Sequence, residues 1–100
     1  MQYKVIMYDI EDNQLRLKVS NILGEYGLIR IQKSVFCGSL TQSQWMTCQQ
    51  EVEEKFLEKK GPEDRIYWLS SSKNQLEGMQ VFGTFPEKSS ILESVIVLHI

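Results

Sequence analysis

Asp9 is the residue whose position most directly suggests chemistry. It ends the run YKVIMYD, residues 3–9, in which apolar side chains predominate. Aspartate is disfavoured in strands, and its charge is costly to bury without a partner. We therefore expect the Asp9 carboxylate either to cap a nearby backbone segment or to bind a ligand.

Four basic residues form a second candidate group. Arg16 and Lys18 lie in the helix expected after Asp9, and Arg30 and Lys33 lie on the β segment that follows it. Such residues bind the phosphates of a duplex backbone, although solvated surface charge is the simpler interpretation of each one.

The charge distribution limits where nucleic acid could bind. The chain carries a net charge of −2, but residues 1–50 hold five bases and four acids, whereas residues 51–100 hold six bases and nine acids. This balance excludes a generally basic nucleic-acid-binding protein. Any phosphate contact must come from a local patch, which we expect in the N-terminal half.

Other conspicuous residues are interpreted as structural. Cys37 and Cys48 have neither metal-ligand spacing nor the density of a disulfide scaffold, so we expect reduced thiols in a cytoplasmic protein. His99 has no cysteine or carboxylate companion, and the run of serines at 70–72 has no neighbouring histidine that could activate a nucleophile, so we expect a loop there. Core packing is expected for Trp45, Phe56, Trp68 and Phe82. A solvated helix face is expected for Glu51, Glu53, Glu54 and Glu58.

The helices and strands that must position these residues are predicted from the spacing of apolar residues and from the positions of capping residues, glycine and proline. The first helix is expected over 12–26, with Asp12 as its N-cap and Gly27 ending it. The second helix begins at Thr41, which stands at capping-box spacing from Gln44, and ends before Gly61 and Pro62. Strands are expected over 3–10, 28–32, 34–38, 65–69, 79–83 and 94–100. The second and third of these form either a tight hairpin or one bent strand.

The order βαββαβ with additional C-terminal β structure predicts an α+β, ferredoxin-like fold, in which both helices cover one face of an antiparallel sheet. We expect one domain over 1–100, with a core at 1–83 and a C-terminal extension at 84–100. The apolar strand at 94–100 would expose an unpaired edge in a monomer, so we expect it to cross to the sheet of a second copy in a homodimer. No apolar run approaches the roughly 20 residues of a membrane span, and no signal-peptide pattern opens the sequence.

The N-terminal pattern resembles the small CRISPR-associated adaptation proteins of the Cas2 family. The resemblance rests on the runs YDIEDNQLRLKV and LGEYGLIRIQKSVFCGSL, and weaker matches at RIYWL and VFG extend it to about residue 83. It implies a ferredoxin-like homodimer that works beside the Cas1 integrase in capturing foreign duplex DNA as new spacers. It also implies a metal-dependent nuclease activity, with single-stranded RNA as another substrate, and places the aspartate matching Asp9 in the dimer cleft.

The resemblance gives Asp9 a catalytic and metal-binding role. Mg²⁺ often takes only one or two protein carboxylates and completes its octahedron with water and phosphate, so one Asp9 from each chain would suffice, with Mn²⁺ as a substitute. Two departures weaken catalysis. The family commonly has a pair of arginines where this chain has Leu15 and Arg16, and often a glutamate where it has Cys37.

Three functions remain open at this point. The first, which we favour, is a dimeric scaffold that holds duplex DNA between integrase subunits, with a vestigial or conditional metal site. The second is a dedicated Mg²⁺-dependent endoribonuclease. The third is a ligand-binding or RNA-binding ferredoxin-like module unrelated to CRISPR, which is the weakest because the aromatic motif of RNA-recognition domains is absent.

Overall fold

The computed structural model describes residues 1–83 and 97–99. Its strands are β1 (Gln2–Asp9), β2 (Ile29–Gln32), β3 (Val35–Leu40), β4 (Arg65–Ser71), β5 (Gln80–Phe82) and β6 (Val97–His99). Its helices are α1 (Asn13–Glu25), α2 (Gln42–Lys59) and α3 (Lys73–Glu77). None of the helices in this described part has the length and apolar character needed to span a membrane.

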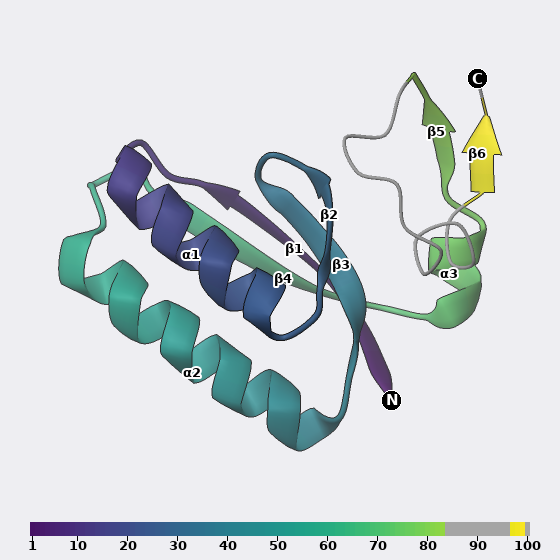
Figure 1. The fold of residues 1–100 in the computed structure, drawn as a ribbon, viewed down its shortest axis with the longest axis horizontal. Coiled ribbons are helices and arrows are strands. Elements are labelled where there is room, and N and C mark those ends of the chain that lie inside the picture. The colour runs from purple at the N-terminus through teal and green to yellow at the C-terminus, as the bar shows by residue number, and fades with distance from the viewer. Residues whose placement is uncertain (84–96, 100) are drawn as a thin grey trace.

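The main sheet has four antiparallel strands in the order β2-β3-β1-β4, and α1 and α2 lie side by side over one of its faces (Figure 1). The predicted α+β, ferredoxin-like arrangement is therefore confirmed. Of the two structures expected for residues 28–38, a tight hairpin or one bent strand, the hairpin is present. β2 and β3 pair across a turn at Lys33 and Ser34, with a register shift between Arg30 and Gln32.

Both long helices begin and end where the sequence predicts. The Asp12 carboxylate accepts a hydrogen bond from the Leu15 amide at 2.8 Å. Thr41 and Gln44 make the reciprocal bonds of a capping box at the start of α2. Gly27 has a φ of 80°, the left-handed conformation that ends α1 without the steric penalty of a side chain.

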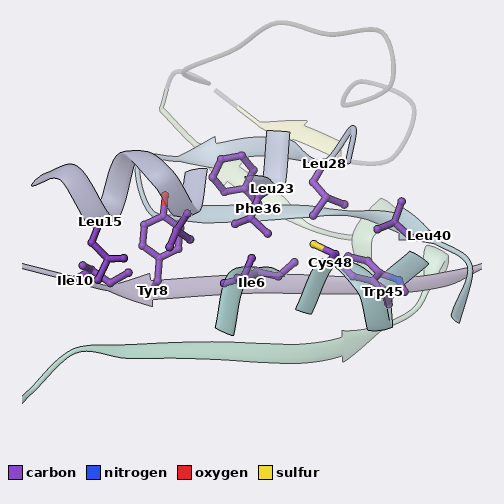
Figure 2. Packing of buried hydrophobic residues seen from close by; sticks show 12 residues of the cluster. Ile6, Tyr8, Ile10, Leu15, Leu23, Leu28, Phe36, Leu40, Trp45 and Cys48 are labelled. Carbon is purple, nitrogen blue, oxygen red and sulfur yellow. The ribbon is translucent and has the colours of Figure 1, made fainter. Parts of the chain in front are cut away.

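The main core lies between the helices and the covered face of the sheet. Ile6, Tyr8 and Ile10 alternate along β1 and the segment just after it, and all three are buried (Figure 2). The cluster is completed by residues of both helices and of β3, among them Leu15, Val19, Leu23, Phe36, Leu40, Trp45, Cys48 and Val52. Trp45 is buried there as predicted, while Phe56 and Trp68 pack against the cluster from its margin.

The other face of the sheet is covered only in part. Leu76 of α3 packs with Cys37 of β3 in a second buried cluster, which Tyr3 and Val5 of β1 also contact. Beyond this cluster, Tyr67 and Leu69 of β4 are 46% and 47% exposed. Met7 is half-buried and lies opposite Tyr67 in the strand register. An apolar area of this face is thus left open.

Two sequence expectations are wrong in this region. The serine run is not a loop, because Ser70 and Ser71 belong to β4 and Ser72 caps α3 by accepting a hydrogen bond from the Gln75 amide at 3.1 Å. Phe82 is not a core residue, since it is 80% exposed. The four glutamates of α2 are exposed as expected.

The C-terminal prediction is only partly within the described residues. β6 pairs in parallel with β5 of the same chain, in a two-stranded sheet separate from the main one. The prediction for 84–96 and for residue 100 lies outside the described residues. The proposed crossing of the C-terminal strand to a second chain therefore stays a prediction.

Candidate functional site

Asp9 is the last residue of β1, and its side chain is exposed. Because side chains alternate along a strand, Asp9 shares the open face of the sheet with Val5 and Met7, opposite the face that carries Tyr8. Arg65, at the start of β4, lies directly opposite Asp9 in the strand register. An exposed carboxylate beside an arginine and next to an apolar face is placed to meet a ligand or a second protein chain.

The backbone beyond Asp9 is held by a different aspartate. Asp64 accepts a hydrogen bond from the Glu11 amide at 3.1 Å through Oδ1 and another from the Gly61 amide at 2.7 Å through Oδ2. The capping of α1 belongs to Asp12. Local capping is thus carried out by Asp64 and Asp12, which leaves the Asp9 carboxylate available for binding.

A groove of about 660 Å³ brings three of the four predicted bases together. Arg16 reaches it from the first turns of α1, and Arg30 and Lys33 reach it from the β2–β3 hairpin. The remaining lining residues are all uncharged, namely Asn13, Leu17, Ser20 and Ser34. Three cations from two elements, with no carboxylate among the lining residues, form a surface that favours an anion.

The hairpin turn that carries this groove is tightly anchored. The Lys33 carbonyl accepts a hydrogen bond from the Tyr8 hydroxyl at 3.0 Å and two from the Arg30 guanidinium, at 3.2 Å from Nε and 2.7 Å from Nη2. The Arg30 guanidinium also lies over the Phe36 ring, 5.5 Å from its centroid. These contacts fix the orientation of Arg30 before any ligand arrives, which reduces the entropy lost on binding.

Tyr8 ties this turn to the core. Its ring is buried and stacks near Phe36, with 6.4 Å between the centroids, and its hydroxyl points away from β1 (Figure 2). Burial raises the pKa of Tyr8, although the positive charges of Arg30 and Arg16 act in the opposite direction. The hydroxyl therefore stays protonated and continues to donate to the Lys33 carbonyl at neutral pH.

Lys18 does not line the groove. It lies two residues after Arg16 on α1, and side chains at that spacing point to different sides of a helix. Lys18 is exposed, and its predicted role in phosphate binding stays a prediction.

The donor set for a metal ion is small. Within residues 1–83 and 97–99, no group of three or more His, Cys, Asp or Glu side chains is placed to hold a metal. By itself, Asp9 supplies one exposed carboxylate as a possible metal ligand. Mg²⁺ requires few protein carboxylates when water and phosphate supply the other ligands, so the site fits such an ion only if a second chain or a bound phosphate completes it.

Several residues of this region were not predicted from the sequence. Tyr8 alternates with core residues, so its position in the sequence indicates only packing. Ser20 lies on the same helix face as Arg16 but carries no charge. Arg65 could have been found from the antiparallel register that places it opposite Asp9. The role of Asp64 could not be predicted from the sequence, because one of its backbone partners, Glu11, lies in the distant loop between β1 and α1.

The cysteines take no part in this site. Both are free and buried, and burial raises the pKa of each thiol from 9.0 to about 11. A thiol with such a pKa is almost entirely protonated at neutral pH and is a poor nucleophile and metal ligand.

Comparison with known proteins supports the sequence resemblance. The family model described as CRISPR associated protein Cas2 matches residues 1–78. A CRISPR-associated endoribonuclease Cas2 from Korarchaeum cryptofilum is 45% identical over 62 residues, which are 62% of this chain and 63% of that protein. A second protein of that name, from Methanospirillum hungatei, is 38% identical over 56% of this chain and 59% of its own. The match thus spans about three fifths of these relatives.

Two further comparisons bear on assembly and on fold. A CRISPR-associated endonuclease Cas1/endonuclease Cas2 fusion from Thermoproteus tenax is 50% identical over 38 residues, which are 38% of this chain and 14% of the fusion. The crystal structure of a hypothetical protein from Thermus thermophilus superposes with a TM-score of 0.67 at 25% identity, covering 86% of this chain and 95% of that one. Since the family model spans residues 1–78 and the fold agrees, this chain belongs to the CRISPR-associated Cas2 family.

Proposed function

We propose that this chain acts in CRISPR adaptation as a cytoplasmic homodimer that holds duplex DNA for a Cas1 integrase. The groove lined by Arg16, Arg30 and Lys33 is the observation that carries this proposal. Three cations from α1 and the β2–β3 hairpin line one groove without a carboxylate, and such a cluster favours the phosphates of a nucleic-acid backbone. Family membership argues against an unrelated ligand-binding module.

The open face of the sheet supports the homodimer. Tyr67 and Leu69 are large apolar side chains that are nearly half exposed, and Asp9 and Arg65 lie at the end of the same face. A second copy packed on this face would cover the apolar area and bring the Asp9 carboxylates of the two chains toward each other. The T. tenax fusion supports a partnership with Cas1, because there the two activities are named within one chain.

The carboxylates brought together in this way would repel each other unless a cation or a proton lay between them. Asp9 from each of two chains would then hold Mg²⁺ or Mn²⁺, and the ion would polarise a bound phosphate. We assign this site a conditional role. Efficient phosphodiester hydrolysis also needs a positioned base, and no third acidic or histidine ligand joins Asp9 in the described part of the chain.

A dedicated metal-dependent endoribonuclease is the second candidate. It is favoured by the names of the K. cryptofilum and M. hungatei relatives, both endoribonucleases, and by the exposure of Asp9 at a strand end. Both candidates use the same aspartate and the same bases. They differ in whether the carboxylate is needed for the biological reaction.

The deciding experiment is Asp9→Asn, which keeps the shape of the side chain and removes its charge. We expect this variant to lose any Mg²⁺- or Mn²⁺-stimulated cleavage, while duplex affinity stays within about threefold of wild type because Asp9 carries no cation for phosphate. Spacer acquisition in cells should persist. Loss of acquisition by a folded, dimeric D9N protein would instead establish the nuclease as the function.

The groove is tested separately through the salt dependence of duplex binding. Each of Arg16→Gln, Arg30→Gln and Lys33→Gln should reduce the slope of log affinity against log salt by about 0.9 if it removes one phosphate contact. Lys55→Gln is the matched control, since Lys55 is an exposed lysine of α2 outside the groove. An unchanged slope in all three groove variants would exclude these residues from DNA binding.

A further inference from the structure

Both residues of the turn between β2 and β3 are bonded to Tyr8. The Tyr8 hydroxyl donates to the Lys33 carbonyl at 3.0 Å, and the Tyr8 amide donates to the Ser34 carbonyl at 3.0 Å. The Lys33 carbonyl also accepts the two hydrogen bonds from the Arg30 guanidinium. One backbone oxygen of the turn thus joins a residue of the central strand β1 to a cation of the groove.

The position of Tyr8 is set by the core. Its side chain is 5% exposed, belongs to the main core cluster and stacks near Phe36 (Figure 2). The strand that carries it, β1, is paired on both sides, with β3 and with β4. The Tyr8 hydroxyl is therefore a fixed point to which the turn is tied.

Arg30 is the groove residue whose orientation depends on the Lys33 carbonyl. Its Nε and Nη2 atoms both donate to that oxygen, and its guanidinium carbon lies 5.5 Å from the centroid of the Phe36 ring. A guanidinium has more N–H groups than these two bonds use, so others remain to donate to a phosphate. A turn that moved would carry the carbonyl, and with it the guanidinium, out of this geometry.

We propose that Tyr8 is a positioning residue for duplex binding. Its hydroxyl holds the Lys33 carbonyl in place, and through that carbonyl it holds the Arg30 guanidinium in the orientation that receives a phosphate. This inference rests on the proposed function of the groove and adds a residue that touches no ligand. Tyr8 is uncharged and is not among the residues that line the groove, so its contribution to binding passes through Arg30.

The first test is Tyr8→Phe, which keeps the ring in the core and removes only the hydroxyl. The Lys33 carbonyl still accepts from Arg30 in this variant, so no buried acceptor is left unpaired and the fold should persist. Duplex affinity should fall about threefold to tenfold, the factor that corresponds to one typical hydrogen bond. The slope of log affinity against log salt should stay unchanged, because no cation is removed.

Tyr26→Phe is the matched control. The Tyr26 hydroxyl donates to Glu51 at 2.9 Å and joins α1 to α2, and Tyr26 does not line the groove. This variant loses one tyrosine hydroxyl bond between distant segments, as Tyr8→Phe does, yet it should bind duplex DNA with unchanged affinity. Equal losses of affinity in the two variants would overturn the assignment of Tyr8.

A double-mutant cycle asks whether Tyr8 acts through Arg30. In the Arg30→Gln background, Tyr8→Phe should cause little further loss of duplex affinity, because the group that it positions is already absent. In the Arg16→Gln background the loss should be as large as in wild type. A loss of equal size in the Arg30→Gln and wild-type backgrounds would show a general structural effect and would overturn the proposal.

A measurement on the free protein separates this inference from the function of the groove. The NMR order parameter of the Arg30 Nε–H bond should be lower in Tyr8→Phe than in wild type or Tyr26→Phe. If the charge-removing groove variants leave duplex binding intact, the proposed function fails, while a lowered order parameter still establishes that Tyr8 positions Arg30. An unchanged order parameter would overturn the inference whatever the duplex result.

Discussion

The two faces of the main sheet are built from alternate residues of the same strands, yet they differ in what covers them. On one face Ile6 and Tyr8 of β1 are sealed by α1 and α2. On the other face Val5 packs under α3, while Tyr67 and Leu69 remain nearly half exposed. The covered face is where this chain gains its stability, and the open face holds apolar area that a monomer leaves in water.

The functional residues follow the same division. Asp9 and Arg65 lie on the open face, at the end where no helix covers it. The groove of Arg16, Arg30 and Lys33 forms where the covered face ends, at the junction of α1 with the β2–β3 hairpin. Binding residues thus lie on the margins of a fold whose centre is apolar, as is general for sites supported by a rigid scaffold.

The largest effect should come from the covered face. Ile6 is fully buried, and Ile6→Ala should lower the free energy of unfolding by about 2–5 kcal/mol, because it removes apolar contacts and leaves a cavity. Urea denaturation measures this loss. Leu69→Ala on the open face is the matched control and should change stability by less than about 1 kcal/mol at protein concentrations too low for association. If both variants lose the same free energy of unfolding, the two faces do not differ in their contribution to stability.

A smaller effect should appear at alkaline pH, because a thiol is buried on each side of the sheet. Burial raises the pKa of Cys37 and of Cys48 from 9.0 to about 11 in the folded chain. Between these values the unfolded chain loses thiol protons that the folded chain keeps, so stability is fully present below pH 9 and falls as the pH rises toward 11. The loss should be on the order of 2 kcal/mol for each thiol.

Urea midpoints across this range measure that decline. Tyr26 contributes above pH 10, since burial and its hydrogen bond with Glu51 raise the pKa of Tyr26 to about 12. The variants Cys37→Ala and Cys48→Ala separate the contributions of the two thiols, because the stability of each variant should fall less steeply with pH than that of wild type. A decline of unchanged steepness in both variants would mean that the thiols do not couple to folding.

The smallest effect should be seen in association through the open face. Tyr67→Ser with Leu69→Ser should weaken a homodimer at least about tenfold, or about 1.4 kcal/mol, with little loss of monomer stability. Light scattering combined with size-exclusion chromatography over a dilution series measures this change. The control pair is Leu17→Ser with Leu57→Ser, two helix residues that are 60% and 66% exposed. If the control pair weakens association equally, the interface lies elsewhere.

The fold was predictable because its signals are local. Asp12, Thr41 and Gly27 mark helix ends through hydrogen bonds and backbone conformations that involve only their neighbours. The short helix α3 was missed for the same reason, because five residues with one buried leucine show no helical period. Phe82 was misassigned because apolar character predicts burial only on average.

The candidate site was predictable only in part. Arg16, Arg30 and Lys33 could be chosen by charge, but their meeting in one groove depends on how α1 packs beside the β2–β3 hairpin. The support of that groove by Tyr8 depends on a hydrogen bond between residues 25 positions apart, which no local pattern reports. Conversely, Arg16 and Lys18 are only two residues apart in the sequence, yet their side chains point to different sides of α1.

The two hydrogen bonds accepted by Asp64 bear on how this molecule opens. The Glu11 amide, 53 residues away from it in sequence, and the Gly61 amide share one carboxylate, so a fluctuation that withdraws Asp64 exposes both amides to solvent at once. Their hydrogen exchange should therefore report a single local unfolding event at this end of the sheet. The segment after Asp9 and the turn between α2 and β4 are therefore expected to open together when Asp64 withdraws.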